Sequence, residues 1–304
     1  MNDPVWLRET DSDSRPKGFV RPTHERAVRA LAALQDARLA DAEKHVIAIP
    51  DSPMDNRAWK LYLRGLTAIQ KREFADAETL LLQAAATASI WAWSMEDGTA
   101  AEGLRLLASC LEKTGLLYRR SDRPDDAYTT HLAALHLRCA HGSIDERWET
   151  LVSLGLDADV ARRYADAENW YRRALSDGAR ADEEAERKQA AAWSHLAVCL
   201  TAVGRHEEAV HAARTARDFW RAHDPGATAV AKADLALGHA LLQHGESLYA
   251  DDSERTRLIL HEARDWLTAA HESLLAFGPE CAADAGGCQE QLDFAGRLLA
   301  SLDG

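Results

Sequence analysis

The side chains best suited to chemistry lie in one short stretch, HLAALHLRCAH, which carries three histidines and one cysteine. His136 and Cys139 are three residues apart, so on a helix the two side chains could bind one metal ion together. A protein metal site has three or four ligands, and this spacing supplies only two of them. His131 also coincides with a packing position of the repeat described below. The sequence therefore predicts no bound metal and no cofactor; a metal-dependent activity built on His131, His136 and Cys139 is the alternative.

Other patterns that could support catalysis are incomplete. Glu208 and His211 have the spacing used in di-iron bundles, but such bundles need a second pair, and no other histidine follows a glutamate by three residues. The two histidines of HEEAVH are five residues apart, whereas the zinc-protease motif needs them four apart. The chain also lacks a glycine-rich phosphate loop and a nucleophile elbow. The sequence therefore predicts that the protein is not an enzyme.

Two stretches repeat one pattern of small and large residues, and this pattern indicates the elements that would position a site. In the first stretch Gly155 is followed, at distances of 9, 12, 16 and 19 residues, by Tyr164, Ala167, Tyr171 and Ala174. In the second stretch Ala197 is followed at the same distances by His206, Ala209, Ala213 and Ala216. Small residues at such places let two antiparallel helices approach closely, while large residues fill the groove beside the crossing.

This pattern resembles the tetratricopeptide repeat (TPR), a helix hairpin of about 34 residues. Further units are marked by a series of alanines whose successive steps are 35, 50, 40, 42 and 54 residues: Ala42, Ala77, Ala127, Ala167, Ala209 and Ala263. Such steps resemble the longer TPR variety, of about 40 residues, found in kinesin light chains and bacterial regulators. The resemblance implies an all-α fold, a right-handed superhelical solenoid of antiparallel helix hairpins. An all-α bundle or a HEAT-like solenoid is the alternative.

The repeats divide the chain into three predicted parts. Residues 1–22 hold three prolines among polar residues and predict a flexible tail. Residues 23–278 predict an array of about six hairpins, in which the segment ESLYADDSERTR interrupts the sixth. The second helix of the second hairpin is expected to run on through Trp91 and Trp93. Residues 279–304 are predicted to form the C-terminal cap. Within them, a flexible stretch from Ala282 to Gly287 is expected before the capping helix.

Composition narrows the class of partner. The formal net charge of −13 repels the phosphate backbone of nucleic acids, and no basic stripe with interleaved aromatic residues is present. No stretch is long and apolar enough to span a bilayer, and the first residues lack the apolar segment of a secretory signal. We therefore expect a cytoplasmic protein with neither nucleic acid nor membrane as partner. Its five cysteines, Cys281 and Cys288 included, are expected to be reduced.

In TPR proteins the first helix of each unit lines a concave groove, so the resemblance implies a set of partner-binding residues. Carried over by position, the set consists of Trp59, Tyr62, Leu66, Ile69, Leu116, Arg119, Arg120, Val152 and Leu156. Later units contribute Ser194, Val198, Thr201, Lys232, Leu235, His239 and Leu242. The lysines and asparagines with which some TPR proteins hold a terminal carboxylate are absent from the matching places, and the chain has only three asparagines for a backbone-binding ladder.

These residues predict a protein–protein interaction scaffold or adaptor that binds a peptide or helix of a partner in the groove. Aromatic and arginine side chains gathered at one place are typical of binding hot spots. Arg119 and Arg120 are expected to select an acidic residue on the ligand through charge-assisted hydrogen bonds. A regulatory sensor that binds a short signalling peptide is the alternative function. For the apolar lining, the alternative is packing between neighbouring first helices, or occupation by the protein's own tail.

Overall fold

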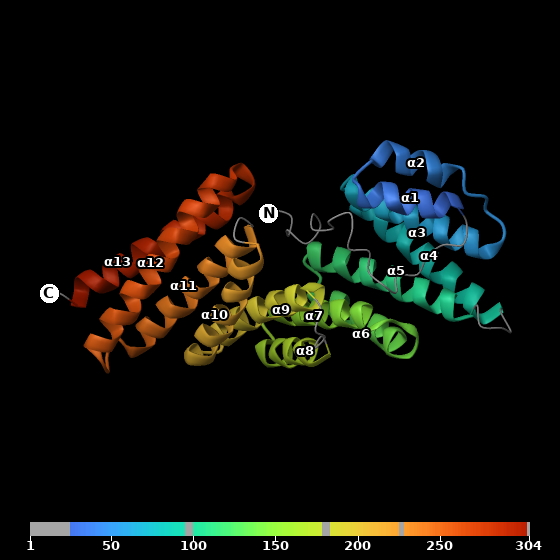
Figure 1. The fold of residues 1–304 in the computed structure, drawn as a ribbon. Helices are drawn as coiled ribbons and strands as arrows, with labels where there is room; N and C mark the ends of the chain where they lie inside the picture. Colours follow the sequence, from blue (N-terminus) through green and yellow to red (C-terminus); the bar gives the residue numbers. More distant parts are fainter. Residues whose placement is uncertain (1–24, 95–99, 178–182, 225–227, 303–304) are drawn as a thin grey trace. The chain divides into compact units, whose positions relative to one another are not determined.

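The structure is a computed structural model, and it describes residues 25–94, 100–177, 183–224 and 228–302. Within these ranges the chain forms helices and no strand (Figure 1), which confirms the all-α prediction. The helices are α1 (Glu25–Gln35), α2 (Leu39–Ile47), α3 (Met54–Gln70), α4 (Phe74–Ser94), α5 (Ala100–Arg120), α6 (Pro124–His141), α7 (Ile144–Val160), α8 (Tyr164–Asp177), α9 (Glu183–Ala202), α10 (His206–His223), α11 (Thr228–Leu248), α12 (Ser253–Phe277), η2 (Pro279–Cys281) and α13 (Ala282–Leu302). The predicted tail, residues 1–22, lies outside the described residues.

Successive helices pair as hairpins within two compact units. The N-terminal unit holds α1–α7 and ends at Arg162, and the C-terminal unit holds α8–α13. In the first, α1 contacts α2, α3 contacts α4 and α5 contacts α6; in the second, α9 contacts α10 and α11 contacts α12. Tight turns make such neighbours antiparallel. These contacts give five hairpins; α7 is the last helix of the N-terminal unit and α8 is the first helix of the C-terminal unit, and the number of about six hairpins stays a prediction.

Five of the turns between successive helices each contain one residue in the left-handed conformation. These residues are Ala37, Arg72, Asp122, Arg162 and Gly204, with φ between 55° and 76°. In four turns the next residue donates its N–H to a carbonyl five residues back, as Arg205 does to Leu200 at 2.9 Å, which is the Schellman end of a helix. Each left-handed residue precedes by five positions one of the marker alanines, and these five alanines are all fully buried. The turns therefore confirm the repeat register.

Two single substitutions at left-handed turn residues, Gly204→Ala and Ala37→Gly, should change the free energy of unfolding in opposite directions. Gly204→Ala puts a side chain at a φ of 76°, and we expect a loss of about 1 kcal/mol because Cβ meets the following carbonyl there. Ala37→Gly relieves the same strain at a φ of 55°, and a gain of roughly 0.5 kcal/mol should remain after the entropy of the unfolded glycine is counted. Urea unfolding of the two variants measures both values, and equal signs would contradict the assignment.

Glycines sit where paired helices cross, and a large side chain of the second helix covers each one. A Cβ added at Gly65 would lie 2.9 Å from Leu81, one at Gly238 would lie 2.7 Å from Leu267, and one at Gly115 would lie 2.6 Å from the ring of His131. Real Cβ atoms do not approach other atoms so closely, so these positions need glycine for the approach of the helices. The predicted alternation of small and large residues is confirmed for these three hairpins.

Two predictions about the chain's C-terminal part are wrong. The segment ESLYADDSERTR is no long insertion, because α11 extends to Leu248 and α12 starts at Ser253, which leaves a four-residue turn. The stretch from Ala282 to Gly287 is not flexible but forms the start of α13. In α13 the two glycines, residues of low helix propensity, are helical because the helix packs on its neighbours. The long repeat steps thus come from long helices; α12 alone has 25 residues.

Three smaller features complete the fold. α4 runs on through Trp91 and Trp93 as predicted; Trp91 is buried and Trp93 is exposed. All five cysteines are free thiols, including Cys281 in η2 and Cys288 in α13. Within the described residues, no helix combines the length and the apolar composition that crossing a membrane requires.

Candidate functional site

Neighbouring hairpins pack mainly through the second helix of one and the first helix of the next, as α4 on α5 and α10 on α11, and their first helices also touch. In the N-terminal unit α1 contacts α3, α3 contacts α5, and α5 contacts α7. In the C-terminal unit α9 contacts α11, and α11 contacts α13, so α13 takes the place of the first helix of a further hairpin. Each unit therefore has a wall of first helices, and the residues that the TPR resemblance picked out lie on these helices.

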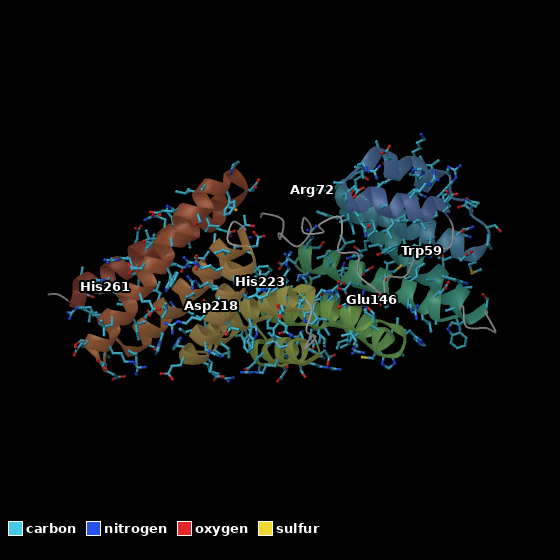
Figure 2. The ribbon with its side chains drawn as sticks, viewed as in Figure 1. Trp59, Arg72, Glu146, Asp218, His223 and His261 are labelled. Atoms are coloured by element: carbon cyan, nitrogen blue, oxygen red, sulfur yellow. The ribbon has the colours of Figure 1, made fainter. Side chains whose placement is uncertain are left out.

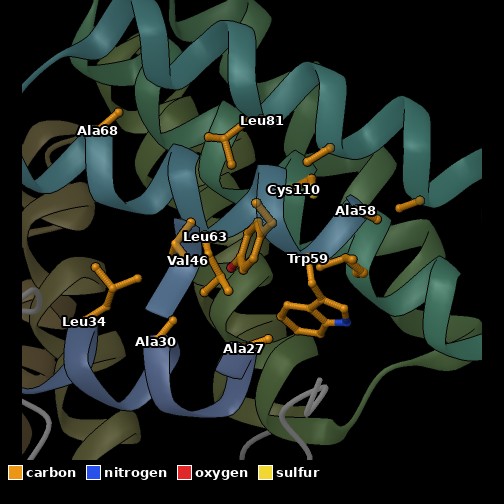
Figure 3. Close-up of a cluster of buried hydrophobic side chains, with 14 of the residues drawn as sticks. Ala27, Ala30, Leu34, Val46, Ala58, Trp59, Leu63, Ala68, Leu81 and Cys110 are labelled. Carbon is orange, nitrogen blue, oxygen red and sulfur yellow. The ribbon is translucent and has the colours of Figure 1, made fainter. Parts of the chain in front are cut away.

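The N-terminal wall is mostly packed. Five of its nine predicted binding residues are buried: Trp59, Tyr62, Ile69, Leu116 and Val152. Trp59 is 4% and Tyr62 is 1% exposed, and their rings meet edge to face with centroids 5.8 Å apart. Trp59 belongs to one cluster with Ala27 of α1 (Figure 3), and Figure 2 shows its place in the unit. This is the packing between first helices that was the alternative reading; whether the set also binds a partner stays a prediction.

The other four predicted residues of this wall, Leu66, Leu156, Arg119 and Arg120, are partly exposed. Arg119 donates hydrogen bonds to Asp157 Oδ1 at 2.7 Å and to the main-chain oxygen of Ser153 at 3.2 Å. The guanidinium of Arg120 lies 6.0 Å from the ring centroid of Phe74. Arg119 is thus engaged with a buried carboxylate, and a ligand would have to compete with that ion pair.

Arg119 belongs to a buried polar network that joins α5, α6 and α7. His131 of α6 lies with Nδ1 at 2.5 Å from Asp157 Oδ2 and with Nε2 at 3.2 Å from the main-chain oxygen of Glu112. Arg138, about two turns further along α6, donates to Glu112 Oε2 at 3.2 Å and to the main-chain oxygen of Glu146 at 2.7 Å, and also to Thr150. His131 and Asp157 are fully buried.

Opposite charges are paired inside this network, which is the condition for burying them: Asp157 lies against Arg119, and Glu112 lies against Arg138. Both ring nitrogens of His131 face acceptors, Asp157 Oδ2 and the main-chain oxygen of Glu112. Burial by itself would raise the pKa of Glu112. The charges of His131 and Arg138 outweigh the effect of burial, and the pKa of Glu112 is lowered to about 2. Ser153 adds a hydrogen bond of 2.9 Å to the same carboxylate. Glu112 is therefore held as an anion.

The histidine and cysteine considered as metal ligands do not form a site in the described structure. His136 and Cys139 are exposed on α6, whereas His131 points into the network. Among the described residues no group of three or more histidines, cysteines or carboxylates is placed to hold a metal ion. His131 instead covers Gly115, the packing role that its position in the repeat indicated.

The C-terminal wall contains an open pocket. It has a volume of about 310 Å³ and is lined by residues of the first helices α9, α11 and α13: Val198, Lys232, Leu235, Ala236, His239, Asp284 and Gln291. Val198 is 45% exposed, and Lys232 Nζ lies 3.4 Å from Asp284 Oδ2. Burial lowers the pKa of His239, although its interaction with Gln291 acts in the opposite direction. Pockets that bind ligands have volumes of about 300–1,000 Å³, so this one suits a small part of a ligand.

Four lining residues of this pocket are positions that the TPR resemblance carried over to the later units: Val198, Lys232, Leu235 and His239. The sequence reasoning missed Asp284 and Gln291, because α13 was expected only to cover the end of the array. The contact of α11 with α13, and not a sequence pattern, places α13 in the series of first helices.

Comparisons with known proteins give the fold. No family model matches the chain, and no curated protein matches its sequence. Many solved structures match it, among them BtubC from P. vanneervenii, with 17% identity over 92% of this chain and 91% of the other, and a TM-score of 0.51. A putative kinesin light chain from Podosopora anserina with nearly identical TPR-like repeats has 15% identity over 69% of this chain and 94% of its own, with a TM-score of 0.50.

A third similar structure is a Rap protein in complex with Competence and Sporulation Factor. It has 15% identity over 91% of this chain and 86% of its own length, with a TM-score of 0.52. At such low sequence identities the similarity to these structures shows the fold, and it does not identify the residues of a binding site. Together with the hairpins, the left-handed turns and the glycine crossings, it shows that this chain has the fold of a TPR-like helical solenoid.

Proposed function

We propose that this protein is an interaction scaffold or adaptor that binds a peptide or helix of a partner along its first helices. The observation that carries this proposal is the pocket on α9, α11 and α13, because it is open, partly apolar and lined at positions where a TPR-like fold presents ligands. The N-terminal set from Trp59 to Leu156 remains part of the proposal. There the partly exposed Leu66, Leu156 and Arg120 are better contacts than the buried Tyr62.

A binding role is favoured over catalysis for a physical reason. A wall of parallel first helices leaves a bound ligand in contact with water, whereas catalytic sites gain from excluding it. The fold likeness to a Rap protein bound to Competence and Sporulation Factor supports a second candidate, a regulatory sensor that binds a short signalling peptide. Both candidates use the first helices, and an acidic residue on the ligand would suit Arg120 in the N-terminal unit or Lys232 in the C-terminal unit.

Site-specific photo-crosslinking tests the proposed wall. A photoreactive phenylalanine analogue is placed at Val198, which is 45% exposed on the first helix α9, and in a second protein at Leu258, which is 68% exposed on the second helix α12. Both positions are apolar and accessible, so they form a matched pair. We expect a partner to be crosslinked from position 198 and not from position 258 in cells that express the protein. Crosslinking only from position 258 would place the partner on the other face.

A further inference from the structure

A second pocket lies within the N-terminal unit, between the start of α3 and the second half of α4. It has a volume of about 320 Å³ and the following lining: Asp51, Ser52, Met54, Arg57, Thr87 and Ile90. None of these residues belongs to the predicted binding set on the first helices. α2 does not contact α4, and Ile90 is 57% exposed. The pocket is therefore open to solvent.

One part of this pocket is apolar. Met54 and Ile90 are large apolar side chains, and both are exposed. Trp93 comes three residues after Ile90, which makes the two neighbours on the surface of α4, and it is 88% exposed. A tryptophan beside exposed aliphatic side chains is typical of interaction surfaces, whereas apolar residues scattered singly are not. This part of the pocket is suited to covering an apolar side chain of a ligand.

The other part of the pocket is cationic. Arg57 is exposed on α3, and within the part of the chain that the structure describes its guanidinium has neither an ion pair nor a hydrogen bond. The same is true of Arg64, which lies seven residues later and therefore on the same face of the helix. Lys60 pairs with Asp51 at 3.1 Å and so neutralises the carboxylate in the lining. α3 thus presents two unpaired cations about 10 Å apart along its axis.

These unpaired cations contrast with the charge of the whole chain. The chain has 49 acidic and 36 basic residues, and its formal net charge is −13. A nucleic acid would bring a continuous row of phosphates against this excess of carboxylates, and the two would repel each other. A peptide can place one or two carboxylates at the arginines alone, where they form charge-assisted hydrogen bonds. The charges therefore favour an acidic peptide as the ligand.

We propose that the pocket, together with Arg64 and Trp93, is a docking site for an acidic peptide segment of a partner protein; we call it the α3–α4 surface. An apolar side chain of the segment enters between Met54 and Ile90, and carboxylates of the segment pair with Arg57 and Arg64. The separation of about 10 Å fits acidic residues that are seven apart on a helix or three apart in an extended segment.

The α3–α4 surface is separate from the wall of first helices. Arg57 and Leu66, which belongs to the predicted binding set, are nine residues apart, and nine residues are two and a half helical turns. Their side chains therefore point to opposite sides of α3. A protein with both sites can hold two segments at once, which is the task of an adaptor. The inference thus adds a second site to the function proposed above and does not depend on the first.

Two double variants with the same change of charge test the cationic part. Arg57→Gln combined with Arg64→Gln removes both cations from the α3–α4 surface. Arg173→Gln combined with Arg264→Gln removes two exposed arginines from the C-terminal unit and is the control. All four side chains are exposed, so we expect the circular dichroism spectrum and the urea midpoint of each variant to equal those of the parent.

The probe is a phage-displayed library of short random peptides, depleted on the Arg57→Gln/Arg64→Gln variant and then selected on the full parent chain. We expect the surviving peptides to carry acidic residues beside an apolar one. They should bind the control variant as they bind the parent, and the Arg57→Gln/Arg64→Gln variant about tenfold or more weakly. Because these contacts are ionic and exposed, binding should also weaken as the salt concentration rises.

A matched pair of apolar positions tests the other part of the pocket. Ile90→Gln should weaken the same peptides about fivefold or more, whereas Leu258→Gln, at an exposed position on α12, should leave their affinity unchanged. Survival of no peptide, or only of peptides without an acidic residue, would overturn the proposal, and so would binding that Ile90→Gln does not affect. A parent chain that dimerises while the Arg57→Gln/Arg64→Gln variant stays monomeric would assign the surface to a second copy instead.

Discussion

His131→Leu is expected to destabilise the N-terminal unit by about 3–5 kcal/mol, the cost of removing one partner from a buried ion pair. Leucine fits the site in shape, since Leu81 and Leu267 occupy the same position over a glycine in two other hairpins. The loss would therefore be electrostatic. Asp157, fully buried, would keep Arg119 but lose its closest partner, 2.5 Å away.

Urea unfolding followed by circular dichroism measures this effect. His136→Leu is the matched control, because it makes the same replacement on the exposed face of the same helix and should change stability by no more than about 0.5 kcal/mol. Adding Asp157→Asn to His131→Leu should recover part of the loss, because the uncompensated charge is then removed. A His131→Leu protein as stable as the parent would show that the network contributes nothing beyond shape.

Acid should destabilise the same unit through Glu112. The pKa of this carboxyl is lowered from 4.5 to about 2 in the folded protein, so the folded state binds its proton later than the unfolded state does. The resulting stability is fully present above pH 4.5 and is lost as the pH falls to about 2. A shift of this size corresponds to on the order of 3 kcal/mol, at about 1.4 kcal/mol for each pKa unit.

The measurement compares the parent with Glu112→Gln over this pH window. The difference in their free energies of unfolding should be constant above pH 4.5 and should shrink as the pH approaches 2. Glu73→Gln, on the exposed surface next to the turn between α3 and α4, serves as control for the general effect of removing a carboxylate. A difference that does not change with pH would mean that Glu112 is not held as an anion by His131 and Arg138.

The sequence predicted the helices well because local and near-local forces decide them. Gly or Ala at the crossing and a large residue in the facing helix recur at fixed spacings, and the structure has Leu81 over Gly65 and Leu267 over Gly238 accordingly. Prolines such as Pro124 start helices where their missing N–H costs nothing. The error at Ala282–Gly287 arose because two glycines, which are weak helix formers, are helical within the packed helix α13, and the error after Gly245 arose because α11 extends to Leu248 and only Tyr249–Asp252 forms the turn.

The predicted binding set shows what positional reasoning could not decide. A periodic apolar face looks the same whether a partner or a neighbouring helix covers it, and for Trp59 and Tyr62 the cover includes other helices of the same unit. The sequence predicted Arg119 to be a surface cation, because its carboxylate partner is not near it in the sequence. Its carboxylate, Asp157, is 38 residues away and meets it only because α5 and α7 are neighbouring first helices.

By itself, then, the sequence determined the all-α repeat, its register and the positions where helices must approach closely, because each of these depends on spacing within one hairpin. Only the tertiary structure decided which polar groups are buried together and which wall is open. Glu112, His131 and Asp157 come from three helices, and the open pocket exists because α13, with Asp284 and Gln291, takes a place among the first helices. Contacts between hairpins set both outcomes, and those contacts leave no periodic signal in the chain.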